Sequence, residues 1–289
     1  MSDYRVEEDT IGPVKIPSDA LWGPQTERSR NNFPTGQFMP IAIIRALLQI
    51  KKAAAEANQE LGQISAEKGQ LIIRAIDELL GLSDEDLRKD FPLRVYQTGS
   101  GTQTNMNTNE VVAHEAAKLD DSIEILPNDD VNHGQSSNDI FPTAMNITAS
   151  VAVKELEDSA QHLIDELKVK QDKYWRTVKI GRTHLQDATP LTFGQEISGW
   201  VSMIEHDLGY LKSLDGTLLE LAMGGTAVGT GLNAAPGFAD DIAARMSKVY
   251  GPKFTAKTNK FYGLAAHSNL DLSPKHLPEP TRLSRTPQP

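Results

Sequence analysis

The sequence of 289 residues contains no cysteine. Disulfides, cysteine-ligated zinc, iron–sulfur clusters and thiol catalysis are therefore excluded. It also has no apolar run near the roughly 18 residues that a membrane-spanning helix needs. Basic residues number 29 against 39 acidic ones, which gives a net charge of −10. Because nucleic-acid affinity depends largely on clustered Lys and Arg, this balance argues against a nucleic-acid partner.

The N-terminus carries acidic side chains and no apolar stretch. This is typical neither of a secretory signal nor of an Arg-rich transit peptide. With 39% hydrophobic and 24% charged residues, the composition predicts a globular protein in the cytoplasm, with no membrane partner. At about 150 residues per domain, the length predicts two domains.

Hydrophobic residues recur at helical spacing along most of the chain, and strand-like alternation is nearly absent. The pattern predicts helices near 40–59, 66–80, 105–119, 143–175 and 238–250. Another is expected after Pro190, with an apolar seam that requires a partner helix: Ile197, Val201, Ile204, Leu208 and Leu211. The helix over 143–175 lacks Gly and Pro and would be about 50 Å long. The fold class is therefore mainly α, with long helices packed as a bundle.

Changes in composition divide the chain. Residues 1–40 are rich in Pro, Gly and Asn and show no sustained helical period. The last 22 residues are rich in Pro and poor in large apolar side chains, which is typical of disorder. We expect an N-terminal domain over 1–135, a central helical bundle over 136–267 and a disordered tail over 268–289.

Two polar loops lead into predicted helices and carry short uncharged donors. The donors are Ser100, Thr102 and Asn105 in the loop 98–110, and Ser136, Ser137 and Asn138 in the loop 132–139. Glycines in the first loop let the backbone approach a ligand, and a helix N-terminus favours an anion. Both loops therefore predict a small-anion site. Simple N-capping of a helix is the alternative explanation for each.

The third polar loop, 181–187, reads Gly-Arg-Thr-His-Leu-Gln-Asp and precedes Pro190, a residue favoured in the first helical turn. His184 has the pKa range of a general acid or base, and Thr183 and Asp187 are neighbours of the kind that orient an imidazole. A structural hydrogen-bonding role for His184 is the alternative. No pair of histidines has metal-ligand spacing with a carboxylate, so no catalytic metal is expected.

A Gly-rich stretch over 222–237 has the composition of a nucleotide-binding loop. The dinucleotide-binding fingerprint needs a preceding strand and a βαβ unit, and the pattern predicts neither. We therefore reject a dinucleotide and expect no cofactor.

In combination, these motifs resemble class II fumarases of the fumarase/aspartase superfamily. The matching stretches are 21–29, 99–110, 127–132, 135–139, 181–191 and 224–231, in family-like order and spacing. Gln103 and His184 are typical of fumarases, whereas aspartases favour Ser and Gln at these places. The resemblance implies a small N-terminal domain and a long-helix bundle of the fumarase/aspartase type. It also implies a homotetramer whose active sites combine loops from three subunits.

The resemblance implies reversible hydration of fumarate to (S)-malate in the tricarboxylic acid cycle. Fumarate is a dianion, and its hydration passes through a carbanion stabilised as an aci-carboxylate. The site must therefore strengthen its hold on one carboxylate as charge develops there. His184 would position and activate the water. The substrate carboxylates would be bound by Ser100, Gly101, Thr102, Asn105, Ser136, Ser137, Asn138 and Thr183.

The sequence departs from the family pattern in two places. Leu126 stands where the family has the His of a His-Pro-Asn-Asp block, so a secondary anion site at Asn128 and Asp129 is expected to be weak. The match ends at about His267, before the family's Gly-Ser-Ser-x-Met-Pro-x-Lys-x-Asn-Pro loop with its proposed catalytic Ser. The resemblance therefore implies a bundle that is incomplete at the C-terminus. An inactive truncated homologue and an aspartate ammonia-lyase stay open as alternatives.

Overall fold

The computed structural model describes residues 4–268 and 270, and they are mainly helical, which confirms the predicted fold class. The chain divides into two compact units. Of the described residues, the first contains 4–148 and 219–267, and the second contains 149–218, 268 and 270. The domain boundaries expected from the sequence stay predictions. The expected disordered tail lies outside the described residues, apart from 268 and 270.

The first unit begins with an antiparallel ribbon of β1 (Tyr4–Asp9) and β2 (Gly12–Pro17). A short helix, α1 (Pro24–Asn32), follows. The sequence pattern predicted neither the ribbon nor this helix. Helix α1 was missed because it is polar throughout and buries Thr26, Glu27 and Ser29 rather than an apolar stripe.

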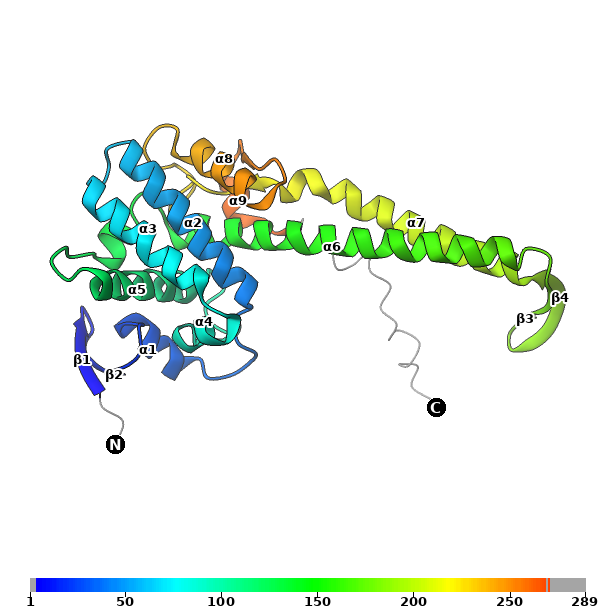
Figure 1. Ribbon diagram of the computed structural model, residues 1–289, viewed down its shortest axis with the longest axis horizontal. Helices are drawn as coiled ribbons and strands as arrows, with labels where there is room; N and C mark the ends of the chain where they lie inside the picture. Colours follow the sequence, from blue (N-terminus) through cyan, green and yellow to red (C-terminus); the bar gives the residue numbers. More distant parts are fainter. Residues whose placement is uncertain (1–3, 269, 271–289) are drawn as a thin grey trace. The chain divides into compact units, whose positions relative to one another are not determined.

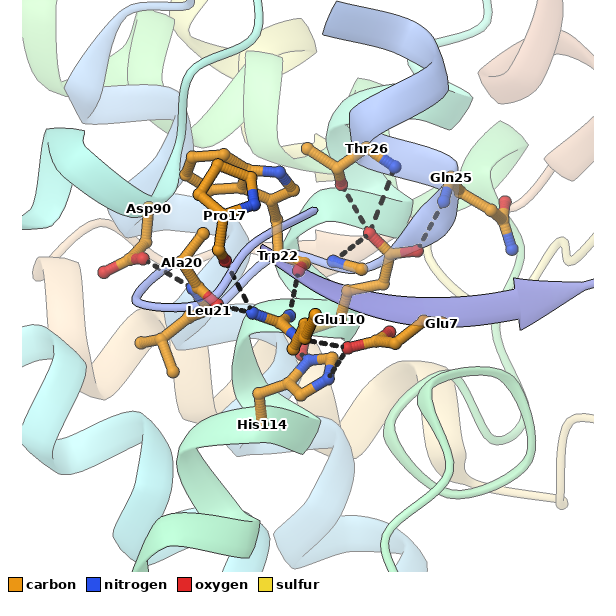
Figure 2. Close-up of polar contacts among 12 residues, drawn as sticks. Glu7, Pro17, Ala20, Leu21, Trp22, Gln25, Thr26, Asp90, Glu110 and His114 are labelled. Carbon is orange, nitrogen blue, oxygen red and sulfur yellow. Dashed lines mark hydrogen bonds and ion pairs between the residues drawn. The ribbon is translucent and has the colours of Figure 1, made fainter. Parts of the chain in front are cut away.

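A carboxylate from a distant helix satisfies the first turn of α1. Glu110 accepts hydrogen bonds from the backbone N–H groups of Gly23 at 2.9 Å, Gln25 at 2.9 Å and Thr26 at 3.1 Å. Figure 2 shows this carboxylate beside Gln25 and Thr26. Burial raises the pKa of Glu110, although each of these hydrogen bonds favours the ionised form. The start of α1 therefore depends on a contact across more than 80 residues.

The core of the first unit lies among α2 (Ile41–Glu60), α3 (Ala66–Gly81), α5 (Thr102–Leu119) and α8 (Phe238–Tyr250). Figure 1 shows α2, α3 and α5 side by side. These helices confirm the predicted helical segments 40–59, 66–80, 105–119 and 238–250. Ser65 is the N-cap of α3, since its Oγ accepts a hydrogen bond from the Lys68 N–H. The smaller elements of the unit are α4 (Asp84–Asp90), the π-helix η1 (Pro127–Val131), β5 (Glu220–Leu221), β6 (Thr255–Ala256) and α9 (Lys260–Ala265).

The longest helix, α6 (Ser137–Lys173), starts six residues before the predicted segment 143–175 and contains Pro142. Pro142 lies directly before the segment that was expected to be helical. Pro142 stands in the second turn of α6, where a proline costs the helix one backbone hydrogen bond. The helix nevertheless continues through it. Residues up to Thr148 belong to the first unit and the rest to the second.

In the second unit, α7 (Phe193–Leu218) carries the predicted apolar seam. Ile197, Val201 and Leu208 pack with Ile164 of α6, which confirms that the seam has a partner helix. Lys168 and Glu205 add an ion pair of 2.7 Å between the two helices.

An antiparallel hairpin of β3 (Val178–Thr183) and β4 (Gln186–Thr192) joins these helices. The helix expected after Pro190 is α7, which begins at Phe193, but the expectation of Pro190 in its first turn is wrong, because Pro190 lies in β4 opposite Ile180. A two-stranded ribbon consists of edge strands, where the missing N–H of proline is tolerated. The strands are largely exposed, so they carry little apolar alternation in sequence.

In the described part of the chain, no helix is both long and apolar enough to cross a membrane. No group of three or more His, Cys, Asp or Glu side chains there is arranged to hold a metal ion.

Candidate active site

The first polar loop ends at Gly101, which precedes α5 in the left-handed conformation, with φ of 72°. A Cβ atom at this position would lie 2.2 Å from Cγ of Phe141, so only glycine fits there. Next to it, the hydroxyl groups of Ser100 and Thr102 are 2.9 Å apart. The Thr98 hydroxyl donates a hydrogen bond to Oε1 of Gln103. The glycine thus brings the short hydroxyl side chains to the N-terminus of α5.

The second polar loop meets α5 at Asn105. This side chain is fully buried, and its Nδ2 donates to Oγ of Ser137 at 3.0 Å and to Oδ1 of Asn132 at 3.2 Å. Its Oδ1 is also buried and has no hydrogen-bond partner among the described residues. The structure therefore brings together two of the predicted site residues, Asn105 and Ser137, from loops about 30 residues apart.

Asp139, in the first turn of α6, connects the second loop to the Gly-rich segment 222–237. Its carboxylate accepts from the backbone N–H groups of Ser136 at 2.8 Å, Gly224 at 3.0 Å and Thr226 at 2.9 Å. Burial raises the pKa of Asp139, while these bonds act in the opposite direction. Asn138 adds a further link, donating from Nδ2 to the carbonyl of Ala227 at 2.6 Å. The Gly-rich segment thus supports the second loop.

Five of the six predicted donors of the first unit line two cavities. The larger, of about 1080 Å³, is lined by Asn105, Ser136 and Ser137, together with residues from η1 and from the Gly-rich segment. The smaller, of about 460 Å³, is lined by Ser100 and Asn138, with apolar walls from Phe141 and Leu264. Gly101 and Thr102 line neither of the two.

The expected secondary anion site lies at η1. Asn128 and Asp129 are exposed and line the larger cavity, and Leu126 beside them is 38% exposed. Lys68, a cation of the same wall, is paired with Asp130 at 2.8 Å. The weakness of this anion site stays a prediction.

Thr183 and His184 lie in the second unit, at the tip of the β3–β4 hairpin. His184 and Leu185 form the turn with φ of 48° and 64°, and both side chains are exposed. Two successive positive φ values suit Gly or Asn, so this backbone is strained. Asp187, expected to orient the imidazole, is instead 3.3 Å from Arg182 in an ion pair. The structure thus places His184 in a different compact unit from the polar loops.

Sequence reasoning missed Lys51 of α2, which is fully buried. Its Nζ donates to Oδ1 of Asn132 at 2.7 Å and to Oε1 of Gln135 at 2.8 Å, directly behind the second loop. A signal was present in the sequence. Lys51 lies three and four residues after Leu48 and Leu47, on the apolar stripe of its helix, where a charged residue is unusual.

Comparisons with known proteins find class II fumarate hydratases among the relatives of this chain. The lyase family matches residues 12–271. The chain is 50% identical over 281 residues to "Fumarate hydratase class II" of Myxococcus xanthus, covering 93% of this chain and 58% of that protein. Identity to the enzyme of the same name from Bacillus subtilis is 47% over 274 residues, with 93% and 59% covered.

Among solved structures, a recombinant class II fumarase from Schistosoma mansoni superposes with a TM-score of 0.88 at 38% identity. The match covers 95% of this chain and 62% of that one. The two folds are therefore of the same type. The chain spans less than two thirds of the length of each of these relatives.

Proposed function

Because the chain belongs to the lyase family, we propose that it serves the reversible hydration of fumarate to (S)-malate, as a class II fumarate hydratase does. The proposal includes these two dicarboxylates as substrates, a homotetrameric assembly and a cytoplasmic role in the tricarboxylic acid cycle. The similarity to class II fumarate hydratases supports it, and the geometry of the polar loops gives it a chemical basis.

The contact between Asn105 and Ser137 is the observation that carries the proposal. Ser137 Oγ accepts a hydrogen bond from Asn105 Nδ2, so the Ser137 O–H is left to donate to a carboxylate. It stands at the N-terminus of α6, where the helix dipole favours negative charge. Neutral donors of this kind stabilise charge that develops on a carboxylate without a metal.

Asn105 offers the complementary group. Its Oδ1 is buried, has no hydrogen-bond partner within the part of the chain that the structure describes, and accepts hydrogen bonds only. A water molecule or the hydroxyl of malate would satisfy it. A donor for a carboxylate and an acceptor for a hydroxyl thus belong to two side chains in direct contact, which suits a reaction that adds water beside a carboxylate.

We further propose that His184 reaches such a site on another subunit, where it positions and activates the water. Its place at an exposed and strained hairpin tip supports a role in a contact with another chain. Thr183, at the end of the same strand, would bind a carboxylate there. Ser100, Gly101, Thr102, Ser136 and Asn138 would complete the binding loops.

Assembly into a homotetramer is supported by apolar side chains on the second unit. Leu163, Val169, Trp200, Met203 and Tyr210 are between 45% and 66% exposed in the single chain. Large apolar side chains exposed together on a surface mark protein–protein contacts. Other copies of the chain would cover them and bring the hairpins to the polar loops.

The test follows fumarate formation from (S)-malate by its ultraviolet absorbance, using the purified 289-residue chain, with size-exclusion chromatography alongside. We expect turnover from an oligomer, and its loss in His184→Asn, since Asn tolerates positive φ and keeps the turn. A folded oligomer that shows no turnover would contradict the proposal and favour an inactive homologue. Turnover of aspartate instead would favour an ammonia-lyase.

A further inference from the structure

A buried lysine stands at one end of a chain of hydrogen bonds that leads to the larger cavity. Lys51 Nζ donates to Asn132 Oδ1 at 2.7 Å, and the same oxygen accepts from Asn105 Nδ2 at 3.2 Å. Asn105 Nδ2 also donates to Ser137 Oγ at 3.0 Å. Asn132, Asn105 and Ser137 line the cavity, whereas Lys51 is fully buried behind them.

The chemistry of lysine determines which group donates and which accepts at each step of this series of hydrogen bonds. In the protonated form its Nζ has donors and no acceptor, so the atoms of Asn132 and Gln135 that face it are carbonyl oxygens. With Oδ1 of Asn132 fixed, Asn105 must present its NH₂ group to that oxygen. Ser137 Oγ then accepts from the same NH₂ group, and its O–H is left to donate into the cavity.

Lys51 also holds the backbone of the second loop through the same two amides. With their oxygens on Lys51, the NH₂ groups face backbone carbonyls. Gln135 Nε2 donates to the carbonyls of Val131 and His133, each at 3.1 Å, and Asn132 Nδ2 donates to the Gln135 carbonyl at 3.3 Å. One buried amine thus shapes the segment that leads to Ser136 and Ser137.

The cost of burying Lys51 indicates that it has a specific role. Burial lowers the pKa of its amine well below the usual value, and the negative charge of Asp139 acts in the opposite direction. An apolar side chain on this stripe of α2 would avoid the desolvation of a charge. When protonated, Lys51 is a cation behind neutral donors and also favours a dianion in the cavity, where Lys68 is already paired with Asp130.

We propose that Lys51 is a positioning residue of the anion-binding cavity, which orients the Asn132 amide and thereby leaves the Ser137 hydroxyl as a donor to the substrate carboxylate. This inference rests on the proposed function, since it takes fumarate or malate as the anion.

The experiment compares Lys51→Met with Lys257→Met in the full chain. Lys257 is a second buried lysine of the first unit, 6% exposed, which lies over the ring of Tyr262 and does not line the larger cavity. Fumarate affinity is measured by titration calorimetry and folding by thermal unfolding. We expect about a tenfold loss of affinity in Lys51→Met, as for loss of one charged hydrogen bond, and none in Lys257→Met.

A double-mutant cycle separates positioning from general damage. Asn132→Ala removes the oxygen through which Lys51 acts, so it should weaken fumarate binding by itself. The variant with both substitutions should lose no more affinity than the weaker-binding single variant. In the turnover assay, kcat should fall as well as fumarate affinity, because the Ser137 donor would hold the carboxylate more strongly as charge develops on it in the transition state.

Unchanged fumarate affinity in Lys51→Met would overturn the inference, and so would fully additive losses in the cycle. Should Lys51→Met fail to fold, unchanged affinity in Asn132→Ala would overturn it in the same way. If the unsubstituted chain binds no fumarate, the proposed function fails instead. Titration with inorganic phosphate then decides the inference, which requires weaker phosphate binding in Asn132→Ala than in the unsubstituted chain.

Discussion

Asp139 Oδ2 accepts a hydrogen bond from the backbone N–H of Thr226 at 2.9 Å, and so joins the first turn of α6 to a segment almost 90 residues later. Thr226 has a positive φ of 54°, which is unusual for a β-branched residue. A buried carboxylate that accepts three backbone N–H groups can hold such a backbone in place. The Gly-rich segment is therefore part of the support of the polar loops, rather than a separate nucleotide-binding loop.

Asp139→Asn should destabilise the first unit although it preserves the shape of the side chain. One of the two carboxylate oxygens becomes an NH₂ group, which faces backbone donors instead of accepting from them. We expect a loss of about 2 kcal/mol in the free energy of unfolding, measured in urea. The same substitution at the exposed Asp121 is the control and should change it little. Equal stability of the two variants would contradict the role of Asp139.

Gly101→Ala should be among the most damaging small substitutions in the chain. The added methyl group would collide with the Phe141 ring, and φ of 72° is unfavourable for alanine. Strain and overpacking together should cost about 2–4 kcal/mol, again measured in urea. Gly99→Ala, two residues earlier, has open space around its Cβ and should have little effect. Partial recovery in Gly101→Ala with Phe141→Leu would identify the ring as the cause.

The sequence predicted those parts of the fold that follow from local periodicity. The apolar stripes of α2, α3 and α8 and the seam of α7 each bury one helical face, so their spacing was sufficient. Helix α1 has no such stripe, and its first turn is satisfied by Glu110 from α5. A carboxylate so distant in sequence leaves no local pattern that predicts the helix.

The candidate site was predicted in its residue types but not in its arrangement. Asn105 and Ser137 were both expected at helix N-termini, and the structure places them 3.0 Å apart. The hairpin around His184 was read as a loop before a helix, because its strands are exposed and carry a proline. Lys51 was missed because it lies inside a helix, whereas the predicted donors all lie in the polar loops or at helix N-termini.

Trp200→Glu should reduce assembly of the chain. Trp200 lies on α7 with 45% of its surface exposed, and a negative charge there would have to be desolvated in a contact with another copy. We expect a smaller apparent mass by size-exclusion chromatography with unchanged helical content by circular dichroism. Lys212→Glu, a charge change at an exposed position on the same helix, is the control. An unchanged mass for Trp200→Glu would exclude this face from the interface.

The β1–β2 ribbon is tied to α5 by an ion pair whose strength depends on pH. His114 Nε2 is 3.0 Å from Glu7 Oε1, and its Nδ1 is 2.9 Å from the Glu110 carbonyl (Figure 2). Burial of the ring lowers the pKa of His114, but the hydrogen bond and charge of Glu7 together raise it above 6.5. Burial likewise opposes ionisation of Glu7, yet His114 and Arg5 bring the pKa of Glu7 below 4.5.

These directions fix the pH range in which the pair stabilises the fold. The stability that His114 contributes is complete below pH 6.5 and is lost as the pH rises through its raised pKa. The stability that Glu7 contributes is complete above pH 4.5 and is lost as the pH falls through its lowered pKa. His114→Gln should therefore cost about 1 kcal/mol near pH 5.5 and less at pH 8.5, measured by urea unfolding. His206→Gln, at an exposed position on α7, should show no such difference. A cost for His114→Gln that is independent of pH would mean that the ring acts by packing, because only the charged imidazolium gains from Glu7.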